Sequence, residues 1–187
     1  MTLLGILRNY ENKLCNKKFC YELNGKDKVH LVFYTENFCH LLGLHYVYHK
    51  DRRYLGARGY DLVSREKVTI ESMKKHNEKG YNYIKLKIDN FNNIYDILTN
   101  GKITKFDVTK TFGDSLISAN LVVYYKNKEL LLHLFLRKEQ EHTSQYTAIS
   151  FIVKSEKEKN YNQYVARQKH MSVTNFEIVD IRSQIEK

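Results

Sequence analysis

The stretch ELLLHLFLRK, residues 129–138, decides the fold class. Its even-numbered positions from 130 to 136 are all leucine, so a strand with a side-chain period of two places them on one face, toward a core. The opposite face then carries His133 and Arg137 beside two apolar residues. The turn Lys126-Asn127-Lys128 joins this stretch tightly to a β-rich run before it, which predicts an antiparallel pair.

Helical and β-rich patterns divide the rest of the chain. Asn24-Gly25 separates two short strands and predicts a hairpin, while Leu3, Leu7, Tyr10 and Leu14 recur at helical spacing. The segment 83–88 fits either a helix or a strand. The predicted helices span residues 2–17, 35–43, 69–76, 83–88 and 91–98, and the predicted strands span residues 18–23, 28–34, 117–125, 129–137, 146–154 and 172–181.

Helices first and strands in succession afterwards indicate an α+β fold. We expect N-terminal helices and a small hairpin packed against a C-terminal four-stranded antiparallel sheet. Thr35 is expected to cap the second helix, and residues 46–60 are expected to form a loop rich in Tyr and Arg. The length of 187 residues fits a single domain spanning 1–187.

Hydropathy and cysteine content indicate the cellular location of the protein. No stretch approaches the roughly 20 apolar residues that span a bilayer. The apolar run at the N-terminus is also too short for the apolar region of a signal peptide. We therefore expect a cytoplasmic protein. Its three cysteines form no disulfide framework and no zinc pattern, so reduced and mostly buried thiols are expected.

The net charge of +10 indicates a polyanionic partner, although the abundance of Lys and Asn also fits an AT-rich coding bias. Nucleic acid, an anionic membrane and an acidic protein all meet this description. No strongly basic amphipathic helix is present, which disfavours the membrane. Gly-rich phosphate loops, HExxH and clustered carboxylates are also missing, so we expect chemistry without a metal and without a cofactor.

Two residues are the leading candidates for catalysis. His40 falls on the side of its predicted helix away from the apolar positions and suits proton transfer near neutral pH, or it is simply an exposed histidine. Arg137 lies at the end of a strand, where a guanidinium can reach a phosphate with two hydrogen bonds or can simply be solvated. His45, on the apolar side, fits a core position.

Further candidates lie beside them. Lys138 follows the arginine, and Thr147 and Ser150 lie on the next strand, where hydroxyls are often no more than strand formers. A regular strand would put Thr147 and Ser150 on opposite faces. Aromatic and cationic residues mix in the predicted loop, as single-strand binding requires, although a mobile Tyr-rich loop fits as well. The predicted RNA-binding residues are Tyr48, Lys50, Arg52, Arg53, Tyr54 and Arg58.

Several motifs together resemble a family. NFCHLLGL at residues 37–44, TIESMKKH at 69–76, LFLR at 134–137 and TAISF at 147–151 look like a phage-type nuclease domain of the barnase–EndoU–colicin–RelE-like (BECR) superfamily. Cys39 stands where that family's pattern has proline. The resemblance covers residues 18–168 as a nuclease core, with a helix at 2–17 before it and a strand at 172–181 after it. It implies helices on an antiparallel four-stranded sheet and metal-independent RNA cleavage on the sheet face.

Two functions follow as hypotheses. The first is an endoribonuclease in which a base such as His40 activates the ribose 2′-hydroxyl and Arg137, helped by Lys138 or a hydroxyl, stabilises the charge on phosphorus. The second is a non-catalytic phage-encoded inhibitor or adaptor that grips RNA or a nucleoprotein complex. An acidic inhibitor protein is a further potential partner of such a basic chain.

Overall fold

The computed structural model describes residues 1–49, 51–112 and 115–181, and the chain forms two compact units. The first, here called the helical unit, comprises residues 1–16 and 33–93, and the second, the sheet unit, comprises residues 17–32 and 94–187. The chain therefore passes between the units three times. Each unit combines segments that are distant in the sequence.

The helical unit contains short helices whose starts follow local capping rules. Thr2 caps the first helix, and Thr69 and Ser72 form a reciprocal capping box at the start of the fifth. Thr35 does not cap the second helix, because that helix begins after Glu36 without a side-chain cap. The helices are α1 (Leu3–Lys13), α2 (Asn37–Leu42), α3 (Leu44–Val47), α4 (Gly56–Ser64), α5 (Ile70–His76) and α6 (Glu78–Asn90), with 3-10 turns at Arg52–Tyr54 and Phe91–Asn93.

An aromatic cluster forms the core of this unit. The ring of Tyr10 on α1 lies 5.3 Å from Phe38 and 5.9 Å from Phe91, measured between centroids. Its hydroxyl donates to the carbonyl of Tyr34 at 2.8 Å, so the buried phenol keeps a hydrogen bond. Residues 46–60, predicted as a loop, are largely helical instead, because Leu44 and Val47 are fully buried and hold a helical turn there.

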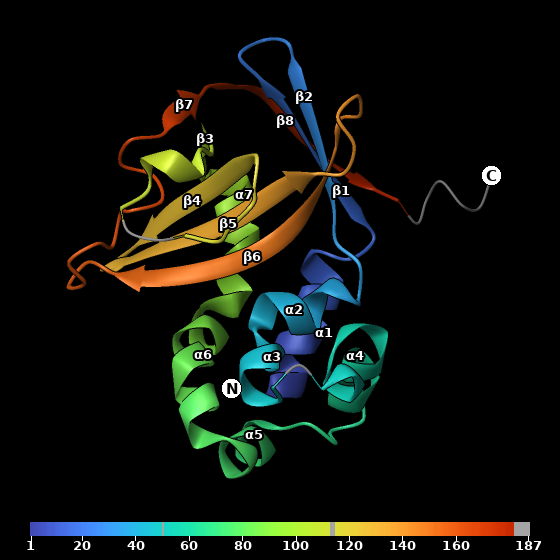
Figure 1. Cartoon of the computed structure of the whole chain (residues 1–187). Coiled ribbons are helices and arrows are strands. Elements are labelled where there is room, and N and C mark those ends of the chain that lie inside the picture. The colour runs from blue at the N-terminus through green and yellow to red at the C-terminus, as the bar shows by residue number, and fades with distance from the viewer. Residues whose placement is uncertain (50, 113–114, 182–187) are drawn as a thin grey trace. The chain divides into compact units, whose positions relative to one another are not determined.

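Among the described residues, the sheet unit contains eight strands and one α-helix. They form one sheet in the order β7-β3-β4-β5-β6-β2-β1-β8 (Figure 1). The strands are β1 (Lys17–Leu23), β2 (Asp27–Val32), β3 (Lys102–Lys105), β4 (Leu121–Asn127), β5 (Leu130–Lys138), β6 (Gln145–Ser155), β7 (Lys169–Met171) and β8 (Val173–Asp180). The helix is α7 (Ile94–Asn100), and a 3-10 turn spans Val108–Lys110.

The predicted four-stranded antiparallel sheet is wrong, although the α+β class holds. The observed sheet is eight-stranded, mixed and nearly closed, because β2 pairs with β6 in parallel and β8 pairs with β1. Turn residues in the sequence predict only hairpins between consecutive strands. The free edge of β6 instead pairs with β2, which is distant in the sequence, because an unpaired edge would leave backbone groups without hydrogen bonds. The predicted small hairpin therefore belongs to the sheet and is not packed against it.

Two devices close this sheet. Ser172 alone separates β7 from β8, so the strands at the two ends of the order are joined by one residue. Asn24, in the β1–β2 turn, donates its N–H to the carbonyl of Ser172 at 2.8 Å and accepts from the N–H of Ser172 at 3.1 Å. The left-handed backbone of Asn24, with φ of 53°, suits this tight turn.

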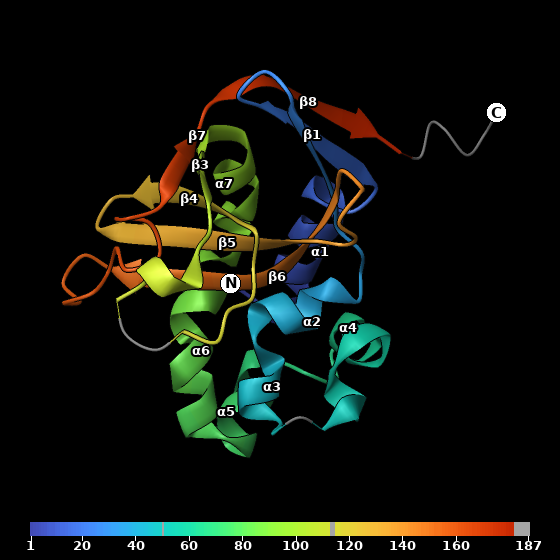
Figure 2. The ribbon, with the colours of Figure 1, turned by 45° about the horizontal axis from the view of Figure 1, so that its top comes forward.

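Helix α7 packs against β4 and β5 (Figure 2). Tyr21 on β1 reaches the carbonyl of Leu98 at the end of this helix, with its hydroxyl donating at 2.8 Å. Cys15, Cys20 and Cys39 are buried thiols that are not joined in disulfides. Within the described ranges, no helix is long and apolar enough to cross a membrane.

His133 is fully buried on β5. Its ring lies 5.4 Å from Tyr164 and 6.3 Å from Phe135, so aromatic rings surround the imidazole. Burial lowers the pKa of His133 to about 4, because desolvation disfavours the imidazolium. The folded protein therefore carries this imidazole in its neutral form.

This burial predicts acid sensitivity of the fold. Between about pH 6.5 and pH 4 the unfolded state binds a proton that the folded state excludes, so the free energy of unfolding falls as pH falls through that window. The loss from this one group reaches about 3 kcal/mol. Urea unfolding at several pH values should show that His133→Leu removes this slope. Replacing the exposed His170 by leucine is the control, and an unchanged slope in His133→Leu would contradict the prediction.

Candidate functional site

One end of the sheet opens into a cavity of about 880 Å³. The strand pairing brings the ends of β1, β3 and β5 and the starts of β2, β4, β6 and β7 to this end. We call this cavity the mouth. Its polar lining consists of the lysines Lys26, Lys28, Lys105, Lys138 and Lys169, together with Asn24, Asp27, Asn120, His142, Thr143, Ser144 and Tyr146.

The mouth is strongly positive. Five ammonium groups face one carboxylate, that of Asp27, and within the described ranges none of the five forms a salt bridge. Lys105 and Lys169 are directly opposed on β3 and β7. Like charges at such positions destabilise a sheet. A bound anion would relieve this repulsion, so the mouth is suited to a phosphate-rich ligand.

Backbone contacts hold the mouth in shape. The side-chain oxygen of Asn120 accepts from the backbone N–H of Lys138 at 2.7 Å, and the backbone N–H of Asn120 donates to the carbonyl of Leu136 at 2.9 Å.

Burial raises the pKa of Tyr146, and the carboxylate of Asp27 raises it further, so this phenol stays protonated. The mouth can therefore offer hydroxyl donors as well as cations.

A β-bulge in β6 interrupts the alternation of its side chains between the two faces of the sheet. Ser150 pairs with Phe135 and Ala148 pairs with Leu136, so Ile149 is an extra residue on β6. Directly opposed residues share a face of the sheet, and Thr147 is opposed to Arg137. Thr147 and Ser150 therefore lie on the same face as Arg137, where a regular strand would have separated them.

This arrangement brings together three of the predicted catalytic residues. Arg137 is exposed, and Thr147 and Ser150 are half-buried beside it. Lys138 points to the alternate face and lines the mouth. All four lie in the sheet unit, and Arg137, Lys138 and Thr147 lie at its mouth end.

A protein-family comparison covers almost the whole chain. Residues 2–182 match the family described as phage-Barnase-EndoU-ColicinE5/D-RelE like nuclease4 (PBECR4). The chain belongs to the PBECR4 family. This confirms the resemblance to the BECR superfamily. No curated protein and no solved structure matches the chain.

The predicted base of this PBECR4 chain lies in the helical unit. His40 is exposed on α2, on the side away from the buried Phe38 and Leu41, as its position predicted. Its ring stacks on that of His45 at 5.4 Å between centroids. His45 is half-buried, where the sequence favoured a core position.

The predicted RNA-binding residues also belong to the helical unit. The rings of Tyr48 and Tyr54 stack on each other at 3.8 Å and 4°, and Tyr48 is 5% exposed, so the Tyr48 ring is not available to a base. The guanidinium of Arg53 lies over the Tyr54 ring at 5.8 Å. Arg53 forms a bidentate ion pair with Asp51, which lowers the pKa of that carboxyl. Arg52 and Arg58 are exposed. Lys50 lies outside the described residues.

Sequence reasoning missed most of the mouth. Among its cations only Lys138 was a candidate, and His142 was not considered. The signal was present, since each missed lysine lies in a turn or at a strand end. Only the strand order shows that these ends meet. The missed residues are Lys26, Lys28, Lys105, Lys169 and His142.

The opposed lysines predict a trade-off between stability and binding. Lys105→Gln removes the repulsion from Lys169 and should stabilise the free PBECR4 chain by about 0.2–1 kcal/mol. It should also weaken binding of a single-stranded oligonucleotide and reduce the slope of log K against log salt by about 0.7 for each phosphate that the variant no longer neutralises. Thermal unfolding and binding titrations at several salt concentrations measure both effects.

Lys126→Gln is the matched control for this experiment. Lys126 is paired with Glu156 at 2.7 Å and lies at the opposite end of β4 from the mouth, so binding should not change. An equal drop in affinity in the two variants would show that general charge, and not the mouth, holds the oligonucleotide.

Proposed function

We propose that this PBECR4 chain is a metal-independent endoribonuclease that cuts RNA by attack of the ribose 2′-hydroxyl on the adjacent phosphorus. The family supports the nuclease part of the proposal. The observation that carries the choice of ligand is the mouth, with five lysines and one aspartate around one cavity. Phosphates of a nucleic acid supply the anions that this arrangement lacks.

The reaction needs a base, an acid and stabilisation of charge. The base takes the proton of the 2′-hydroxyl, O2′ bonds to phosphorus, and the bond from phosphorus to O5′ breaks as O5′ takes a proton from the acid. The products are a 2′,3′-cyclic phosphate and a free 5′-hydroxyl. Phosphorus carries extra negative charge between these steps, and fixed cations stabilise it.

We assign charge stabilisation to Arg137 and Lys138. Arg137 is exposed and can offer two parallel N–H groups to phosphate oxygens. Thr147 and Ser150 share its face and can donate hydroxyl hydrogen bonds to the same phosphate. Lys138 points to the opposite face of β5, where it lines the mouth and provides a point charge for a neighbouring phosphate.

An imidazole is assigned to proton transfer. We assign this role in the sheet unit to His142, the imidazole that lines the mouth itself, and His40, the base predicted from the sequence, is tested beside it. Both side chains are exposed and neither is needed for core packing. Each can therefore be replaced with little effect on folding.

Cleavage in EDTA tests the proposal. Wild-type chain should convert RNA into fragments that end in a 2′,3′-cyclic phosphate, and an oligonucleotide with 2′-deoxyribose throughout should remain intact because it lacks the nucleophile. Arg137→Ala should lower the rate by about 100-fold or more. Alanine at one of His40 and His142 should lower it by a similar factor, which identifies the acting imidazole.

Two results would contradict the assignment. If both histidine variants and Arg137→Ala cut as fast as wild type, the proposed residues are wrong. If RNA binds tightly and in a salt-sensitive way but no fragments form, the chain is a non-catalytic RNA binder. Lys126→Gln again serves as the charge-matched control, because that lysine is already paired.

A further inference from the structure

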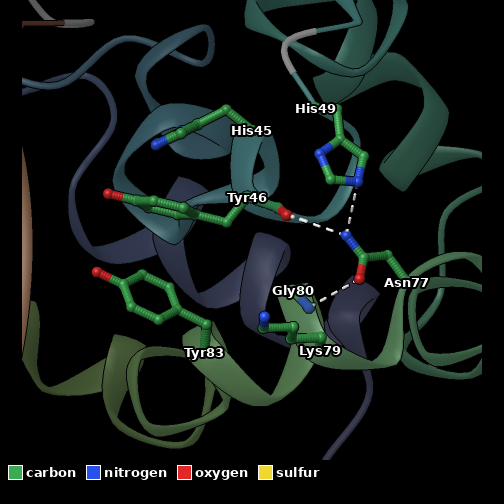
Figure 3. Close-up of a pocket in the computed structure, with 7 residues that line it drawn as sticks. All are labelled: His45, Tyr46, His49, Asn77, Lys79, Gly80 and Tyr83. Atoms are coloured by element: carbon green, nitrogen blue, oxygen red, sulfur yellow. Dashed lines mark hydrogen bonds between the residues drawn. The ribbon is translucent and has the colours of Figure 1, made fainter.

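A second cavity lies wholly within the helical unit. It has a volume of about 720 Å³, within the usual range for small-molecule sites. Its walls come from α3 and the residues after it and from the first turns of α6 (Figure 3). The lining residues are His45, Tyr46, His49, Asn77, Lys79, Gly80 and Tyr83.

Aromatic rings form one wall of this cavity. The ring centroids of His45 and Tyr46 are 4.2 Å apart, and those of Tyr46 and Tyr83 are 4.5 Å apart. Tyr46 is 41% exposed and Tyr83 is 66% exposed. Figure 3 shows the hydroxyls of Tyr46 and Tyr83 pointing to the same side. Tyr46 lies between the other two rings, so Tyr83, at the end of this stack, is the ring with a face left for a ligand (Figure 3).

Two glycines bring these rings together. A side chain at Gly80 would place its Cβ 2.3 Å from the carbonyl oxygen of Tyr46, so only glycine lets α6 approach α3 this closely. Gly43, with φ of 91°, ends α2 in a left-handed conformation and starts α3 at once. The ring wall is thus fixed by the backbone.

Asn77 sets the polar side of the cavity. Its Oδ1 accepts from the N–H of Gly80 at 2.9 Å, so its amide nitrogen faces Nε2 of His49 at 3.0 Å (Figure 3). The same amide nitrogen lies 3.3 Å from the carbonyl oxygen of Tyr46 and 3.2 Å from that of Val47, so its two hydrogens have three acceptors within reach. When Nε2 of His49 accepts one of them, Nδ1 is the ring nitrogen that can donate to a ligand. Lys79 adds an exposed ammonium.

We infer that this cavity binds one base of a single-stranded nucleic acid, with the base stacked against the outer face of the Tyr83 ring. A nucleobase has a flat π-face and acceptor atoms on its edge, which match the ring wall and the donors on His49 and Lys79. The inference rests on the proposed function only in taking RNA as the source of the base. Binding requires no cleavage.

The test uses neutral probes, so that the lysines of the mouth do not contribute. Saturation-transfer NMR on the full chain should detect binding of adenosine but not of ribose at the same concentration. Tyr83→Ala should weaken adenosine binding by about tenfold, and Tyr83→Phe should retain it, because the ring and not the hydroxyl is needed. Tyr34→Ala is the control, since Tyr34 is a 51% exposed tyrosine of the same unit outside the cavity.

The outcomes separate this inference from the proposed function. Equal binding of ribose and adenosine, or unchanged adenosine binding by Tyr83→Ala, overturns the base-binding site even if wild-type chain cuts RNA. Adenosine binding that disappears in Tyr83→Ala and persists in Tyr34→Ala supports the site even if no RNA fragment ever forms.

Discussion

The parallel pairing of β2 with β6 is the constraint on which the sheet unit depends. It joins the strands β7-β3-β4-β5-β6 to the strands β2-β1-β8, and without it each group would expose an open edge. Only His30 with Gln145 and Leu31 with Tyr146 are in register there, so the parallel ladder is short. The covalent link between β7 and β8 and the Asn24–Ser172 hydrogen bonds make closure at the far ends of the order possible.

Closure has an electrostatic consequence. Strand ends are where lysines are tolerated, because their ammonium groups reach solvent beyond the core. In an open sheet those ends form a line, whereas in this sheet they surround one cavity. The unfavourable pairing of Lys105 with Lys169 is a cost of that geometry, and the absence of salt bridges among the described mouth residues leaves it uncompensated within the chain. Functional sites are where such local costs are retained.

Local sequence patterns predicted individual helices and strands. They could not predict which distant strands pair with each other, and the shape of the sheet depends on that pairing. Thr69 placed the start of α5, and the alternation in residues 129–138 placed β5 with its leucine face inward. By contrast, β2 and β6 are far apart in the chain, and a parallel pair has no turn to mark it. Ile149 is an ordinary strand residue, yet as the extra residue of a bulge it moves Thr147 to the face of Ser150. For the same reason the lysines at strand ends could be counted from the sequence, but their meeting at one mouth could not be predicted.

The cavities of the two units suit different parts of a nucleic acid, the mouth its phosphates and the helical cavity its bases. The mouth has five lysines and a single tyrosine, while the helical cavity has two tyrosines and two histidines with one lysine. Phosphate binding weakens steeply with salt, because counterions compete for the lysines, whereas stacking on a ring depends on contact area and changes little. Added salt should therefore weaken a ligand bound in the mouth of the sheet unit much more than a ligand bound against the rings of the helical unit.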